Sequence, residues 1–230
     1  MIMLEGNTIY LYGVIGDDMF DYASSDIQFR SALHELKGQP VNVRINSPGG
    51  DAYVGFNMFK ALKEHDSEVT TINDGLAASA ASLVFVAGVK RIMTRPSMIM
   101  IHEPATIVYG NAAEMQRAAD FLTKMNDEIV DTYASATGKS TEQIASMLAA
   151  ETWMTTEESI DLGFATTSEF VEAGSIEVQN SIVPEGRFRN TPQNYLKPKA
   201  ELHRIKRRDL SPEFTARLAK LQERTGIAVR

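Results

Sequence analysis

The chain has 230 residues, enough for one domain with a sizeable core and a short appendage. It contains no cysteine, which excludes disulfide bonds, a cysteine nucleophile and cysteine-ligated metal sites. The net charge of −7 is unevenly divided, because residues 1–185 have 11 basic and 26 acidic side chains, whereas residues 186–230 have 12 and 4. An acidic body therefore precedes a basic tail.

No stretch of the chain approaches the roughly 20 apolar residues of a membrane-spanning helix. The first ten residues, MIMLEGNTIY, contain no basic region before an apolar one, so we expect no secretory signal. The sequence thus predicts a cytoplasmic protein that makes no contact with a membrane.

The first half of the chain alternates strand and helix patterns. Strand patterns occur at Ile9–Tyr12, Val41–Ile45 and Val69–Asn73, and helical patterns at Ile27–Leu36 and Ala52–His65. A strand, a helix and a second strand at this spacing predict βαβ crossovers, and hence a parallel sheet with helices packed on it. The expected fold class is therefore α/β.

Two uncharged stretches follow. Residues Ala77–Ala87 (AASAASLVFVA) predict a buried helix that ends at Gly88. Residues Met98–Ile101 (MIMI) predict a short, fully buried strand. The middle of the chain is thus expected to form the inner part of the core.

The later part of the chain is expected to be helical and then irregular. Helix patterns extend over residues 111–138 and begin again at Ser140 and Thr155, each with a suitable capping residue. Periodic patterns then end. We therefore expect a compact domain over residues 1–178, followed over residues 179–230 by a basic linker and a short C-terminal amphipathic helix.

Ser79 is the first candidate for a chemical role. It follows the strand pattern Val69–Asn73 and the turn signal Asp74-Gly75, near the start of the uncharged helix. Free backbone N–H groups and the positive end of the helix dipole face such a position, and they stabilise the negative charge that develops in acyl transfer. Two alternatives remain at this point: Ser79 only caps the helix, or Ser82, one turn further, is the nucleophile.

His102 is the second candidate, because it stands at the carboxyl end of a predicted strand, where open α/β sheets bind ligands. The alternative is a hydrogen-bonded structural histidine. No cluster of histidines and carboxylates predicts a metal site. The pair Gly49-Gly50 belongs to no phosphate-loop motif, so no cofactor is expected, and the two glycines instead permit close approach of a substrate backbone.

Four segments resemble the proteolytic subunit of the Clp protease: INSPGGD at Ile45–Asp51, GLAASAAS at Gly75–Ser82, SMIMIHEP at Ser97–Pro104, and TGKSTEQIASMLAAETWMTTEESIDLGFA at Thr137–Ala165. They occur in the order and spacing of that family. The resemblance implies a crotonase-like, ClpP-like fold, which is a spiral of parallel βαβ units. It also implies that the long helix interlocks stacked rings of a homo-oligomer.

The resemblance further implies roles for individual residues. Ser79 would attack the scissile carbonyl group, and His102 would accept its proton and later pass it to the leaving amine. This selects Ser79 over the serine three positions later. The backbone N–H groups of Gly50 and Ala80 would form the oxyanion hole.

Glu151 stands where the family has an aspartate. A glutamate can orient a histidine in the same way, but its extra methylene group changes the reach, so a surface carboxylate or a Ser–His dyad is the alternative. The segment 105–110 would align an extended polypeptide by strand addition. The residues expected to contact substrate are Gly49, Ile107, Val108 and Tyr109.

Two departures from the family matter. The first predicted strand begins within about ten residues of Met1, so the loops that engage an ATP-driven unfoldase are not expected, and the basic tail is an addition. Both features resemble the Clp-like head maturation (prohead) proteases of bacteriophages. They predict an ATP-independent endopeptidase that acts on phage scaffold or capsid proteins. A bacterial subunit that works with an unfoldase is the alternative.

The remaining hypotheses concern other classes of protein. A catalytically weak scaffolding protein on the same fold is favoured only by Glu151. An acyl-CoA hydratase needs an adenine-nucleotide pocket and acidic catalytic residues, and leaves Ser79 and His102 unexplained. Signal peptide peptidases pair serine with lysine rather than histidine. Nucleic acid is not an expected partner, because the basic tail has few aromatic residues and no recognisable binding module.

Overall fold

The structure, a computed structural model, describes residues 2–16, 25–170 and 187–192. The chain divides into two compact units, Met1–Leu196 and Lys197–Arg230, and every described residue belongs to the first. The predicted domain boundary at residue 178 and the predicted C-terminal helix lie outside the described residues.

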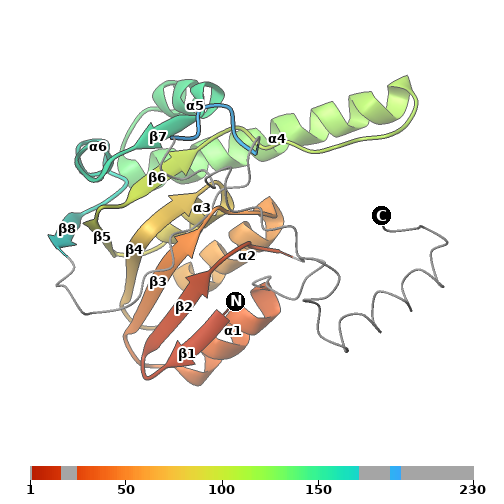
Figure 1. The fold of residues 1–230 in the computed structure, drawn as a ribbon. Coiled ribbons are helices and arrows are strands. Elements are labelled where there is room, and N and C mark those ends of the chain that lie inside the picture. Colours follow the sequence, from red (N-terminus) through yellow and green to blue (C-terminus); the bar gives the residue numbers. More distant parts are fainter. Residues whose placement is uncertain (1, 17–24, 171–186, 193–230) are drawn as a thin grey trace, which may run out of the picture. The chain divides into compact units, whose positions relative to one another are not determined.

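The described residues form one 8-stranded sheet (Figure 1). Its strands are β1 (Ile2–Glu5), β2 (Thr8–Tyr12), β3 (Val41–Ser47), β4 (Val69–Ala78), β5 (Lys90–Arg95), β6 (Met98–Ile101), β7 (Thr152–Met154) and β8 (Thr167–Phe170). The main path runs β1-β2-β3-β4-β5-β8, and β6 pairs with both β4 and β7. Only the β1–β2 and β6–β7 pairs are antiparallel among the described strands. The predicted α/β fold with a mostly parallel sheet is therefore confirmed.

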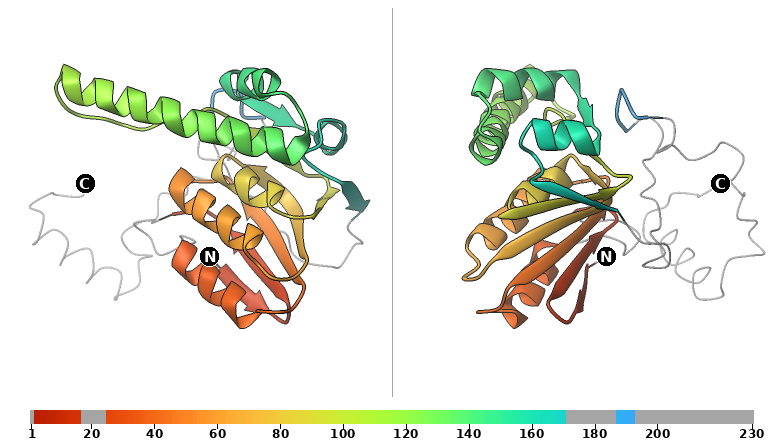
Figure 2. Two further views of the ribbon diagram at one scale, coloured as in Figure 1. Left: turned by 180° about the vertical axis from the view of Figure 1, so that it is seen from behind. Right: turned by 90° about the vertical axis from the view of Figure 1, so that its left-hand side faces the viewer.

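Three helices cover one face of this sheet, as Figure 2 shows for α1, α2 and α3. The helices are α1 (Asp26–Glu35), α2 (Ala52–Lys63), α3 (Ala80–Val86), α4 (Ala112–Thr137), α5 (Thr141–Ala150) and α6 (Thr156–Asp161). The core between these layers contains Phe29 of α1, Met58 of α2 and Phe85 of α3, all fully buried. None of the helices in the described ranges is long and apolar enough to cross a lipid bilayer.

Capping residues fix the starts of the later helices as the sequence predicts. Asn111 with Glu114 and Thr155 with Glu158 each form a complete capping box, in which the two side chains satisfy each other's backbone N–H groups. The Ser140 side chain accepts a backbone hydrogen bond at the start of α5. These contacts are local in sequence, which is why the pattern reveals them.

The predicted helix Ala77–Ala87 is too long at its start, and the turn predicted at Asp74-Gly75 lies inside β4. β4 continues to Ala78 because its last residues pair with neighbours on both sides: Ala77 lies opposite Ser47 of β3 and Ile99 of β6. This pairing satisfies the backbone N–H and C=O groups that a helix would otherwise use. α3 therefore begins only at Ala80.

The long helix α4 is buried at one end only. Ile129, Val130 and Tyr133 of its C-terminal half are buried, whereas Met115 and Phe121 of its N-terminal half are 51% and 43% exposed. Figure 1 shows this N-terminal half extending beyond the sheet. This helix thus packs against the described residues over only part of its length.

A charged cluster joins the three neighbouring strands β2, β3 and β4. The Asp74 side chain of β4 is 1% exposed and accepts hydrogen bonds from Arg44 Nε at 2.8 Å and from the Tyr12 hydroxyl at 2.7 Å. Arg44 Nη2 also contacts Asp74 Oδ1, which makes the pair bidentate. Burial raises the pKa of Tyr12, and the hydrogen bond to Asp74 raises it further, so the phenol stays neutral and remains a donor.

Replacing Arg44 by Met should lower the free energy of unfolding by about 3 kcal/mol, because the Asp74 carboxylate then stays buried without its cationic partner. Urea denaturation at pH 7 measures this loss. The control is Lys90→Met, which breaks the exposed Lys90–Glu68 pair (3.0 Å) and should cost about 0.5 kcal/mol or less. Equal small losses in both variants would contradict the importance of the buried cluster.

Candidate active site

Ser79 occupies a sharp turn between β4 and α3. Its backbone has φ 54° and ψ −127°, a conformation that non-glycine residues adopt only where the surrounding structure imposes it. The Ser79 N–H donates to the Met100 carbonyl of β6 at 2.8 Å. Its side chain makes no capping hydrogen bond to α3. The capping alternative for Ser79 is therefore wrong, and its hydroxyl is available for another partner.

That partner is His102, which directly follows β6. Ser79 Oγ lies 2.7 Å from His102 Nε2, a hydrogen-bonding distance that permits proton transfer. Burial lowers the pKa of His102, because it disfavours the imidazolium cation. The Glu151 charge opposes this effect, and the Arg187 and Arg189 charges add to it. His102 is thus neutral at pH 7 and can accept a proton.

Ser82 has a different place. It is fully buried, and its hydroxyl donates to the Ser79 carbonyl oxygen at 2.6 Å and lies 2.7 Å from the Tyr133 hydroxyl of α4. These contacts join α4 to the turn at Ser79. Burial raises the pKa of Tyr133, so this phenol is neutral. Ser82 and Tyr133 therefore stabilise the turn through buried hydrogen bonds, a role that neither residue type nor spacing reveals in the sequence.

Gly49 permits the close packing of the β3–α2 loop against the Ser79 turn. Its φ is +79°, and a Cβ atom at this position would lie 2.4 Å from the Ala78 carbonyl oxygen and 2.7 Å from the Ser79 Cβ. A Cβ atom on Gly50 would lie 1.8 Å from the Ile15 carbonyl oxygen. Both positions thus require glycine for reasons of space, and the packing brings the Gly50 and Ala80 backbones to the same cavity as Ser79.

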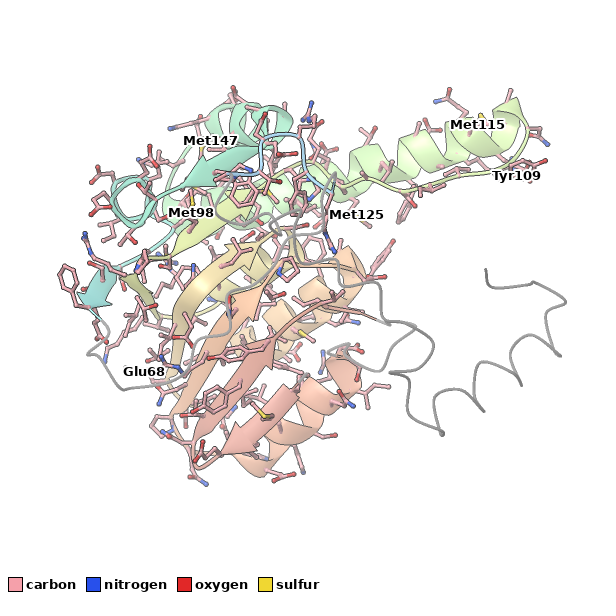
Figure 3. The ribbon with its side chains drawn as sticks, viewed as in Figure 1. Glu68, Met98, Tyr109, Met115, Met125 and Met147 are labelled. Atoms are coloured by element: carbon pink, nitrogen blue, oxygen red, sulfur yellow. The ribbon has the colours of Figure 1, made fainter. Side chains whose placement is uncertain are left out.

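This cavity has a volume of about 320 Å³ and contains both Ser79 and His102 in its lining. Its inner wall is apolar and comes largely from α3 and α4, with Leu83, Met125 and Ile129 among its residues; Figure 3 labels Met125 on α4. The rings of Tyr53 and Phe121 stack at one side with their centroids 5.8 Å apart. The arrangement therefore suits an apolar side chain placed beside the Ser79 hydroxyl.

Glu151 is buried, with 5% exposure, at the end of α5. Its carboxylate accepts hydrogen bonds from the backbone N–H groups of Arg189 and Asn190 at 2.8 and 2.5 Å, and from Trp153 Nε1 at 3.4 Å. No hydrogen bond joins Glu151 to His102 within the described ranges. Glu151 thus affects the pKa of His102, but its hydrogen bonds go to Arg189, Asn190 and Trp153.

The segment expected to bind substrate runs beside α4 without regular structure (Figure 3). Ile107 and Tyr109 are fully exposed, and Val108 is 37% exposed. None of the three lines the cavity, whereas the neighbouring Pro104 does. Their contact with substrate stays a prediction. The described part of the chain contains no group of three or more metal-ligating side chains.

Phe188 is the residue near the site that sequence reasoning missed. Its ring packs against the His102 ring with centroids 5.2 Å apart. It lies in the segment predicted to be a linker, and no periodic pattern or motif around it signals a contact with the body of the protein. Only the tertiary structure reveals its position.

Comparison with known proteins gives a consistent result. The family model described as Clp protease matches residues 2–167. The ATP-dependent Clp protease proteolytic subunit 1 of Chlamydia abortus is 39% identical over 130 residues, which is 55% of this chain and 68% of the relative. The subunit of the same name from Chlamydia caviae is 38% identical over 179 residues, 70% of this chain and 94% of the relative. A solved structure of a ClpP1 mutant from Listeria monocytogenes superposes with a TM-score of 0.63 at 25% identity, covering 72% of this chain and 92% of that one.

Gly49→Ala should lower the free energy of unfolding much more than Gly38→Ala, its matched control. Both glycines have φ near +80° (+79° and +77°), but a Cβ atom on Gly38 meets nothing within 4 Å. The control should therefore cost about 1–2 kcal/mol for the backbone conformation alone. Gly49→Ala should cost about 2 kcal/mol more, because the Ser79 turn must move. Equal losses in urea denaturation would contradict the close packing described here.

Proposed function

The chain belongs to the Clp protease family and is a serine peptidase, and we propose that Ser79 is its nucleophile and His102 its general base. One observation carries this assignment: Ser79 Oγ lies 2.7 Å from His102 Nε2, in a shared cavity. A serine hydroxyl is a weak nucleophile unless an adjacent base removes its proton. This pair meets that requirement.

The proposed reaction proceeds in two stages. As Ser79 Oγ forms a bond to the scissile carbonyl carbon, its proton passes to His102 Nε2. The carbonyl oxygen becomes negatively charged and accepts hydrogen bonds from the backbone N–H groups of Gly50 and Ala80. The C–N bond then breaks, and the imidazolium gives its proton to the leaving amine. A water molecule, deprotonated by the same imidazole, finally hydrolyses the ester on Ser79.

Glu151 contributes to this reaction through its charge. The Glu151 carboxylate raises the pKa of His102 against the lowering effect of burial, so it stabilises the imidazolium that forms when Ser79 attacks. We assign Glu151 this electrostatic role instead of a direct hydrogen bond to the imidazole. A dyad of Ser79 and His102, supported by a nearby negative charge, is the resulting catalytic unit.

The same geometry supports a preference for apolar side chains next to the cleaved bond. The cavity beside Ser79 has an apolar inner wall, and its stacked rings of Tyr53 and Phe121 close one side. Residues 105–109 are exposed and lie outside the strands of the sheet, so an extended polypeptide can reach their backbone groups. The proposed substrate is thus an unfolded polypeptide.

Assembly into a ring homo-oligomer belongs to the proposal as well. The N-terminal half of α4 extends beyond the sheet and exposes Met115, and Phe121 remains 43% exposed although it stacks on Tyr53. Apolar side chains on such a projecting helix are typical of a surface that another subunit covers. This apolar surface supports the expected interlocking of copies of the chain.

The biological setting has two candidate forms. The basic tail, which the Clp family lacks, is the ground for proposing a head maturation protease that acts without ATP on phage scaffold or capsid proteins. The names of the bacterial relatives, which are ATP-dependent subunits, favour a subunit that works with an ATP-driven unfoldase. The general proposal, a cytoplasmic serine endopeptidase, is common to both forms.

A fluorophosphonate probe should label the wild-type protein, and Ser79→Ala should abolish the labelling and lower peptide hydrolysis by at least about 10⁴-fold. Ser82→Ala should still be labelled, because Ser82 supports the turn and does not face His102. Mass spectrometry of the labelled peptide locates the modified serine. Labelling that survives Ser79→Ala would remove the nucleophile assignment.

ATP dependence separates the two biological forms. A head maturation protease should degrade an unfolded polypeptide such as casein when purified alone, at the same rate with and without ATP. A bacterial subunit should hydrolyse short peptides alone but should degrade proteins only when an unfoldase and ATP are added. The measurement is the rate of protein degradation with an unfoldase and ATP divided by the rate for the purified protein alone, and Ser79→Ala gives the background rate.

A further inference from the structure

Residues 187–192, which we call the strap, pack beside His102 and outside the cavity. The strap is separated from β8 by residues 171–186, yet it contacts α5, β7 and His102. Thr191 Oγ1 donates to the Phe188 carbonyl oxygen at 3.4 Å, which closes a turn within the strap. The strap thus reaches the site from a part of the chain beyond the family match at residues 2–167.

The strap is anchored on the C-terminal end of α5. Arg189 Nη2 donates to the Ala149 carbonyl oxygen at 3.0 Å, and Asn190 Nδ2 donates to the Ala150 carbonyl oxygen at 3.0 Å. The last carbonyl groups of a helix have no partner within the helix, so these side chains supply what α5 lacks. The anchor fixes the strap backbone next to Glu151.

The anchored backbone then binds the Glu151 carboxylate. Arg189 N–H donates to Oε2 at 2.8 Å and Asn190 N–H donates to Oε1 at 2.5 Å, so both carboxylate oxygens have a backbone donor. Two backbone donors of this kind fix the orientation of a carboxylate. The strap therefore fixes the position of the Glu151 carboxylate relative to His102.

Phe188 covers the imidazole itself. Its buried ring lies edge-on to His102 at 5.2 Å and to Trp153 at 6.0 Å, and it packs in a small cluster with Leu76 and Met100. Aromatic side chains in such edge-to-face contacts hold each other in defined orientations. Phe188 thus restricts the rotation of His102 and itself lies outside the cavity.

The strap does not obstruct the site. No strap residue lines the cavity that contains Ser79 and His102, and the 2.7 Å hydrogen bond between these two side chains forms with the strap in place. A segment that inhibited the enzyme would occupy the cavity or separate the pair. The observed contacts instead support a competent arrangement.

We propose that Phe188 and the Arg189–Asn190 backbone are positioning elements of the peptidase: Phe188 orients the His102 ring, and the two N–H groups hold the Glu151 carboxylate. This inference rests on the proposed function of Ser79 and His102. It predicts that the strap affects turnover more than substrate binding, because it touches the base and its neighbouring charge but not the cavity.

The pH dependence of kcat/KM follows from the pKa of His102. The groups that face His102 are the Ser79 hydroxyl, the Glu151 carboxylate, the Arg187 and Arg189 guanidinium groups, and the adjoining Glu103 backbone. Burial is the largest effect and lowers the pKa of His102, so the neutral, active form persists below the ordinary 6.5. Removing the Phe188 ring admits water and raises this pKa. The acidic limb of kcat/KM should then move to higher pH.

The first test compares three full-length variants in peptide hydrolysis. Phe188→Ala should lower kcat by about tenfold or more with KM changed less than about twofold, and should move the acidic limb of kcat/KM to higher pH. Phe188→Leu keeps apolar cover over His102 and should restore most of kcat and the wild-type limb. The matched control is Phe170→Ala, which removes an 80% exposed ring on β8 and should behave as wild type.

The second test isolates the backbone donor. Asn190→Pro deletes the N–H that binds Glu151 Oε1, whereas Asn190→Ala keeps that N–H and removes only the side-chain bonds to α5. The proline variant should lose severalfold more kcat than the alanine variant, at equal thermal stability of the folded protein. If Phe188→Ala does not fold, this pair of variants decides the inference.

Three results would overturn the inference. Higher activity in Phe188→Ala would make the strap inhibitory. Wild-type kcat and an unchanged pH profile in Phe188→Ala would show that the strap has only a structural role. Equal kcat in the two Asn190 variants would show the same. Fluorophosphonate labelling of wild-type Ser79 is measured in parallel: its presence with such results rejects the strap alone, whereas its absence rejects the proposed function itself.

Discussion

The contact on which the site depends is a backbone hydrogen bond from the Ser79 N–H to the Met100 carbonyl oxygen, 2.8 Å long. It continues the parallel β4–β6 ladder by one residue beyond the Ala78–Met100 pair. Since His102 follows Met100 by two residues, the register of this ladder brings the imidazole level with the Ser79 side chain. A slip of one residue would turn the side chains of β6 to the opposite face and separate the pair.

The turn at Ser79 is held in an unfavourable conformation by its neighbours. A backbone of this kind costs about 1–3 kcal/mol and persists only where the surroundings fix it. The β3–α2 loop packs against the turn through Gly49, and the buried Ser82 hydroxyl binds the Ser79 carbonyl group from the other side. Tyr133 connects this support to α4. The nucleophile position is therefore a property of several elements together, whose packing offsets the local strain.

The sequence predicts what depends on local pattern and on shared motifs. The capping boxes at Asn111 and Thr155 arise from contacts between residues near in sequence, and the βαβ units follow from the alternation of strand and helix patterns; the structure contains both. The split of Ala77–Ala87 between β4 and α3 could not be predicted, because an uncharged run is compatible with a buried strand or a buried helix. The pairing of Ala77 with two strands, which decides between them, is tertiary.

The same distinction explains the candidate site. Ser79 and His102 can be recognised in the sequence, because Ser79 lies near the predicted start of a helix and His102 at the predicted end of a strand. The surroundings of Glu151 have no local signal, since its partners Arg189 and Asn190 lie almost 40 residues away in an irregular, basic stretch. Nor does the contact between Phe188 and His102 follow from any spacing rule. Long-range contacts made by single residues leave no periodic trace in a sequence.

The strap and β8 are separated by 16 residues, 171–186, in one continuous chain. A covalent connection keeps a docked segment at a high effective concentration, so even weak contacts remain occupied. Cutting the chain between β8 and the strap would leave every atom of the site in place at first. The strap would then be free to dissociate, and its occupancy would depend on protein concentration. A single nick distant from the cavity could in this way limit the lifetime of the active enzyme.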